Sequence, residues 1–86
     1  MIDTWHAGFA VELIRFAGRN RLCIDLDYGG RTRLVEPYSF RQSQPGDLLF
    51  FGWNVPDGEI RSYRADRIAG VRVTNRPFAP RFAVEF

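Results

Sequence analysis

The spacing of apolar and polar residues predicts one amphipathic helix near the start of the chain. Over about residues 4–18, apolar side chains recur at helical spacing, in a stripe made of Phe9, Leu13 and Phe16 with a second row beside it made of Ala10, Ile14 and Ala17. Asp3 or Thr4 can cap the start of this helix, and Gly18 can end it. The pattern indicates a helix that covers an apolar surface with one of its sides.

After the helix, the chain alternates in the manner of short β-strands. Residues 21–28 place four apolar side chains on one face, namely Leu22, Ile24, Leu26 and Tyr28. The pair Gly29-Gly30 then predicts a tight hairpin turn. Further strands are expected over residues 31–41 (bent at Pro37), 47–53, 59–63 and 68–74. Between the last two, Arg64–Arg67 is too short for an α-helix and predicts a single 3₁₀ turn.

Five short, bent, antiparallel strands favour a sheet that curls on itself, because curling covers the strand edges. The sequence therefore predicts a mainly β fold, a five-stranded SH3-like or Sm-like antiparallel barrel with one N-terminal helix. We expect a single domain over residues 1–86, with the helix at about 4–18, the barrel at about 21–75 and an extended C-terminal tail at 76–86. Phe82, Val84 and Phe86 alternate in that tail, which either adds an edge strand or docks against the core.

The amino-acid composition limits which ligands, disulfides and cellular compartments are plausible for this protein. All twelve basic residues are arginine and the net charge is +2, which is too small for bulk electrostatics to attract a nucleic acid. The only cysteine, Cys23, excludes an intrachain disulfide, and its apolar neighbours indicate a packing role. There is no signal sequence and no apolar run long enough to cross a bilayer, so we expect a cytoplasmic protein without a membrane partner.

Three arginines, Arg61, Arg64 and Arg67, follow one another at intervals of three. In a 3₁₀ turn, residues i and i+3 lie on the same side. The pattern therefore predicts a fork of guanidinium groups, which suits phosphates, carboxylates or base edges. An alternative is a solvated surface network in which these arginines pair with Asp66 and Glu59.

The remaining polar residues indicate structural roles. Asp25 and Asp27 lack further oxygen ligands nearby, so we expect them to pair with Arg31 or Arg33 across the hairpin rather than to bind a metal. The single histidine, His6, has no partner that suggests catalysis or metal binding. Because the chain offers no nucleophile–base pair, metal-ligand cluster or glycine-rich phosphate loop, we predict no enzymatic activity, no cofactor and no metal.

The order of these landmarks resembles the WYL domain family of bacterial proteins. The resemblance is carried by residues 33–40 (RLVEPYSF), by the apolar strand 48–51, and by residues 61–68 (RSYRADRI), which are similar to the R-x-F-R-x-x-R-I run of that family. It covers about Val11 to Phe78. The Trp-Tyr-Leu motif that names the family is not present, and Leu48-Leu49-Phe50 or Asp47-Leu48-Leu49 stands in its place.

This resemblance implies an Sm-like barrel that acts as a ligand-sensing module in bacterial transcription regulators, usually C-terminal to a helix-turn-helix domain. Nothing before Val11 is long enough to be a helix-turn-helix, so a longer parent chain would supply it. The implied ligand is single-stranded nucleic acid or a nucleotide, with Tyr38 or Tyr63 stacking on a base. Carried over to this chain, the ligand-binding residues are Arg61, Arg64, Arg67, Arg33, Tyr38, Ser39 and Tyr63.

A second function remains open beside ligand sensing. Small β-barrels assemble through exposed strand edges, and the apolar tail that ends in Phe86 is suited to an interface. The alternative is therefore a structural or oligomerisation module that forms homo-oligomers.

Overall fold

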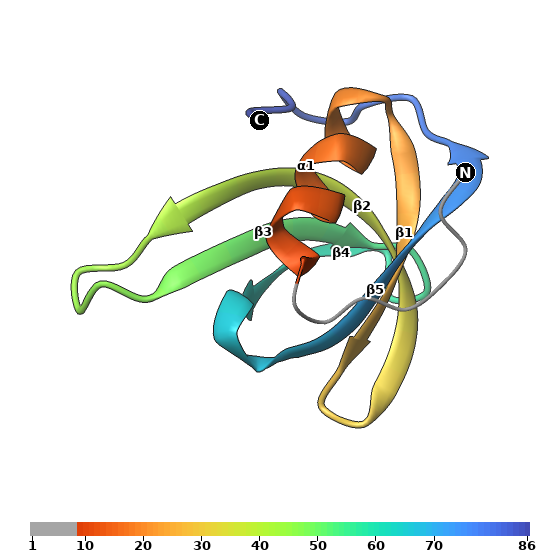
Figure 1. Ribbon diagram of the computed structural model, residues 1–86. Coiled ribbons are helices and arrows are strands. Elements are labelled where there is room, and N and C mark those ends of the chain that lie inside the picture. Colours follow the sequence, from red (N-terminus) through yellow and green to blue (C-terminus); the bar gives the residue numbers. More distant parts are fainter. Residues whose placement is uncertain (1–8) are drawn as a thin grey trace.

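The computed structural model describes residues 9–86, in which a single helix precedes five strands (Figure 1). The strands are joined by turns, with one 3₁₀ turn, η1, before the last strand. In chain order the elements are α1 (Ala10–Arg19), β1 (Leu22–Tyr28), β2 (Arg31–Gln42), β3 (Leu48–Asn54), β4 (Glu59–Arg64), η1 (Ala65–Arg67) and β5 (Ile68–Pro77). The predicted mainly β fold with five antiparallel strands and one helix is confirmed.

The helix α1 lies with its row of small residues toward the sheet. Ala10, Leu13, Ile14 and Ala17 are buried, whereas Phe9 and Phe16 are 63% and 47% exposed. The buried side is therefore centred on the row that the sequence placed beside the main stripe, because alanines let the helix approach the strands closely. The expected residues 4–8 of this helix, its Asp3 or Thr4 cap, and His6 lie outside the described residues.

The five strands form one antiparallel sheet in the order β4-β3-β2-β1-β5. The two-residue hairpin turn is confirmed, since Gly29 and Gly30 have φ angles of 60° and 75°, which the left-handed pair of a tight hairpin requires. The sheet is curled but not closed, because no strand pairing joins β4 to β5 among the described residues. The seam is held by side chains instead, and Arg64 N–H donates a 3.1 Å hydrogen bond to the Tyr28 hydroxyl.

Two apolar clusters lie on the two faces of this curled sheet. The main core packs α1 against the inner face and includes Ile24, Leu26, Val35, Phe50, Val71 and Val73. The second cluster lies on the outer face and consists of Cys23, Tyr38 and Phe78, with Leu34, Trp53 and Val84 packed against it. Cys23 is 2% exposed and its burial raises the pKa of the thiol, which agrees with a packing role.

The C-terminal tail covers the second cluster rather than extending the sheet. One parallel bridge joins Glu85 to Ser39. The tail then runs past the C-terminal end of α1 (Figure 1), where the Phe86 ring packs over Gly18 and lies 5.7 Å from the Phe40 ring. Of the two arrangements expected for the tail, the structure shows the docked one.

One expected pairing is wrong. Asp25 does not pair with Arg31 or Arg33 across the hairpin but with Arg72 on the other neighbouring strand, β5, at 2.6 Å. The register explains this, since Asp25 lies directly opposite Arg72 in the β1–β5 pairing and opposite Leu34 in the β1–β2 pairing.

Candidate anion-binding site

The predicted fork of three arginines does not form. Strand β4 continues to Arg64, so Arg61 and Arg64 belong to the same strand and lie three residues apart. Side chains alternate between the two faces of a strand, which places Arg61 and Arg64 on opposite faces. The turn η1 begins only at Ala65, one residue too late to align Arg64 with Arg67.

Arg64 lies in a network with carboxylates of its own chain. Its Nη2 is 2.9 Å from Asp66 and 3.4 Å from Asp47, and the hydrogen bonds to Asp66 are the main reason that its pKa is raised. Arg67 is exposed and makes no ion pair with any residue in the part of the chain that the structure describes. This corner therefore corresponds to the solvated network that was the alternative to the fork.

A different group of arginines converges between the two hairpins. Arg31 and Arg33 at the start of β2 and Arg61 on β4 line one polar recess of about 420 Å³. The recess lies between the end of the β1–β2 hairpin and the β3–β4 hairpin. The other residues that line it are Tyr28, Asn54, Asp57, Ile60, Ser62 and Tyr63.

Arg33 is held in the recess by aromatic rings and not by a carboxylate. Its Nη2 donates a 3.0 Å hydrogen bond to the Tyr28 carbonyl, and its guanidinium lies 5.9 Å from the ring centroids of both Tyr28 and Tyr63. Ring faces attract guanidinium groups and leave the N–H donors at the edge unused. Within residues 9–86, Arg33 has no ion pair, so its remaining donors are available to an anion.

The ion pairs of Arg61 are weak competitors for such an anion. Arg61 contacts Asp57 at 2.9 Å and Glu59 at 2.6 Å, and all three side chains are 40% exposed or more. Ion pairs of this exposure contribute about 0–1 kcal/mol each. Three arginines and one carboxylate, that of Asp57, line the recess, so its local charge is positive.

The remaining predicted residues separate from the arginines. Tyr63 is 3% exposed and stacks on Phe50 at 5.8 Å, so it forms the floor of the recess and presents no open ring face. Tyr38 is equally buried on the outer face, and Ser39 lies beside it in a separate pocket. Of the seven predicted site residues, three line the recess, namely Arg33, Arg61 and Tyr63. The other four do not line it, namely Arg64, Arg67, Tyr38 and Ser39.

Arg31 and Tyr28 were not among the predicted site residues. They flank the Gly29-Gly30 turn and lie directly opposite one another at the end of the hairpin. The Gly29-Gly30 turn was the sequence feature that could have identified them as site residues, because it places the two side by side at the end of the sheet.

The described residues form neither a metal-ligand cluster nor a membrane-spanning helix. Among residues 9–86, no three histidine, cysteine, aspartate or glutamate residues cluster as metal ligands. No helix described there is long and apolar enough to span a membrane.

Comparisons with known proteins show similarity at the level of the fold. No protein-family model matches the chain, and no curated protein matches it. Among solved structures, it is similar to the proteasome accessory factor B/C (PafBC) of Arthrobacter aurescens, with a TM-score of 0.73 and 22% sequence identity. The match covers 92% of this chain and 14% of that chain. At this identity the likeness shows the fold alone.

Proposed function

We propose that this chain is a non-enzymatic sensing module that binds an anionic ligand of the nucleic-acid or nucleotide type. The observation that carries the proposal is the convergence of Arg31, Arg33 and Arg61 in one polar recess. The resemblance of residues 33–40 and 61–68 to WYL domains supports it, and the fold shared with PafBC is compatible with it. In this proposal a longer chain supplies the helix-turn-helix domain.

Binding would use guanidinium groups on phosphate oxygens. Arg33 is oriented by the two tyrosine rings before the ligand arrives, and Arg61 exchanges its exposed carboxylate partners for the phosphate. Arginine presents paired N–H groups that match two oxygens of one phosphate. The rings of Tyr28 and Tyr63 support the recess from within the fold, so the site recognises the phosphate and sugar rather than a stacked base.

The test is binding of a labelled single-stranded oligonucleotide and of a mononucleotide at low and at physiological ionic strength. Affinity is expected to fall with salt because bound phosphates release counterions. Arg33→Gln and Arg31→Gln should each weaken binding about tenfold or more, since a hydrogen bond to a charged group contributes about 1.5–3 kcal/mol. Asp57→Asn should strengthen it, because it removes one of the two carboxylates that compete for Arg61.

Arg67→Gln is the matched control, since Arg67 is exposed, carries the same charge and does not line the recess. It should leave affinity nearly unchanged. The absence of binding at low salt would contradict the proposal. So would an equal loss in Arg67→Gln and Arg33→Gln, which would indicate attraction by net charge alone.

A further inference from the structure

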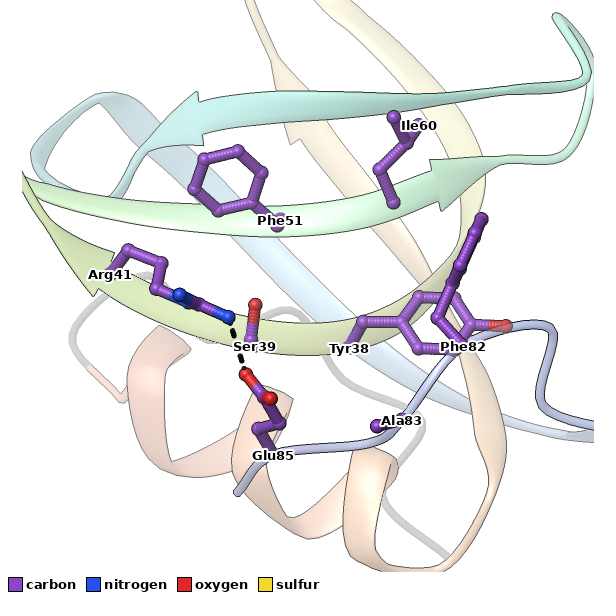
Figure 2. A pocket seen from close by; sticks show the side chains of 8 residues that line it. All are labelled: Tyr38, Ser39, Arg41, Phe51, Ile60, Phe82, Ala83 and Glu85. Carbon is purple, nitrogen blue, oxygen red and sulfur yellow. Dashed lines mark hydrogen bonds and ion pairs between the residues drawn. The ribbon is translucent and has the colours of Figure 1, made fainter.

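A second pocket opens on the face of the sheet opposite to Arg61 (Figure 2). It has a volume of about 400 Å³ and lies between strands β2, β3 and β4 and the C-terminal tail. It is lined by Tyr38, Ser39, Arg41, Phe51, Ile60, Phe82, Ala83 and Glu85. This volume is within the range of pockets that bind small molecules.

The walls of this outer pocket are apolar and rigidly supported. Figure 2 shows the side chains of Phe51 and Ile60 on β3 and β4, with Tyr38 and Phe82 beyond them. Ile60 and Phe82 are 45% and 48% exposed, so a ligand in the pocket would remove apolar surface from water. The Tyr38 ring is held in place because its hydroxyl donates to Glu36 at 2.8 Å and accepts from the Arg81 amide at 2.9 Å.

One end of the outer pocket is polar and has unused donors. Ser39 is only 7% exposed, its hydroxyl points into the pocket (Figure 2), and it makes no side-chain hydrogen bond within the described residues. No fully buried side-chain polar atom in the described residues lacks a hydrogen-bond partner, so the Ser39 hydroxyl still reaches solvent and is accessible to a ligand. Beside it, Arg41 uses one nitrogen, Nη2, for a 2.7 Å ion pair with Glu85. A guanidinium has five N–H donors, so most of those on Arg41 are available to a ligand.

We propose that the outer pocket binds a small planar aromatic molecule that carries one carboxylate. Its ring lies against Phe51, Ile60 and Phe82, and its carboxylate accepts hydrogen bonds from Arg41 and Ser39. The carboxylate competes with Glu85 for Arg41, and Glu85 belongs to the tail. This site shares only Ile60 with the lining of the arginine recess, and its ligand is of a different class.

The experiment is an NMR titration in which the backbone amide signals are followed as 2-naphthoate is added. A parallel titration with 2-naphthalenemethanol, which has the same ring system but no charge, is the ligand control. Naphthoate should shift the amides of Ser39, Arg41, Phe51 and Ala83. Arg41→Gln should weaken naphthoate binding about tenfold, as expected for the loss of a charge-assisted hydrogen bond, and should leave the binding of the alcohol unchanged. Glu85→Gln should strengthen naphthoate binding, because it removes the competing carboxylate.

The side chains of Arg41 and Glu85 are 63% and 51% exposed, so both substitutions leave the core intact. The matched control is Arg76→Gln, which removes an exposed arginine that lines neither pocket. The proposal is overturned if naphthoate at saturating concentration shifts no amide of the outer pocket. It is also overturned if the shifts occur in the arginine recess, or if Arg41→Gln and Arg76→Gln weaken binding equally.

Discussion

Among single residues, Glu36 shows how a buried charge is compensated in this protein. It is 5% exposed and accepts hydrogen bonds from the Tyr38 hydroxyl at 2.8 Å and from Arg81 Nε at 3.1 Å. The Arg81 guanidinium also lies 4.5 Å from the centre of the Trp53 ring. A buried carboxylate is costly unless it is paired and hydrogen-bonded, and here a residue of the tail supplies the pairing charge.

The Tyr38 hydroxyl should make stability depend on alkaline pH. Burial raises the pKa of Tyr38 from 10.0 to about 12. Between those values the unfolded chain releases this proton and the folded chain keeps it, so the free energy of unfolding should fall as pH rises from 10 to 12. Urea unfolding across this range tests the effect. Tyr38→Phe should show a smaller decrease, and an identical decrease in both proteins would contradict the assignment.

At the scale of elements, a bulge in β2 explains where the tail attaches. The pairing of β2 with β3 shifts register between Pro37 and Ser39, which leaves Tyr38 without a partner on β3. The Tyr38 carbonyl instead accepts a 2.8 Å hydrogen bond from the Glu85 amide. Proline at position 37 has no N–H to donate to a β-ladder, and a bend was expected there. The irregularity beside it leaves the Tyr38 carbonyl available to accept the hydrogen bond that holds the tail.

The contact between the tail and α1 can be tested at Gly18. A Cβ at this position would overlap the Phe86 ring, so Gly18→Ala should displace the ring and destabilise the protein. In a Phe86→Ala background the same substitution should stabilise it by about 1 kcal/mol, because alanine is the better helix former. Chemical denaturation of the four proteins gives the coupling. The same effect of Gly18→Ala in both backgrounds would show that Phe86 does not pack there.

For the molecule as a whole, the main feature is a curled sheet whose two edge strands do not pair. β4 and β5 lie at opposite ends of the strand order and are joined through η1. Near this seam, Tyr28 packs edge-on against Tyr63 at 5.1 Å and accepts the Arg64 N–H. The arginine recess lies beside these two rings, and no residue of β5 lines it.

Tyr28→Phe tests whether this hydrogen bond closes the seam. The substitution keeps the ring and removes the acceptor, so the free energy of unfolding should fall by about 0.5–1.5 kcal/mol. Hydrogen exchange at the Arg64 amide should become faster than in the wild type. Ser62→Ala on the same strand is the control, since Ser62 is exposed and should change neither quantity. Unchanged exchange at Arg64 in Tyr28→Phe would show that the seam is held by packing alone.

The helix, strands and turns of this protein follow from local patterns in its sequence. Helical spacing over residues 10–17, alternation over residues 22–28 and the Gly29-Gly30 pair each act within a few residues, and the structure confirms the helix, the strand and the turn. The fork inferred from the arginines of residues 61–68 did not form, although the fold as a whole is similar to that of PafBC.

Which side chains contact one another depends instead on the folded arrangement of the whole chain. Arg33 and Arg61 are 28 positions apart in the sequence, and the curl of the sheet brings both into the recess. Asp25 forms its ion pair with Arg72 and not with Arg31, because strand register, and not proximity in sequence, sets which residues are cross-strand neighbours. A binding surface built from separate strands depends on register and curl, and both follow from packing over the whole chain rather than from any local pattern.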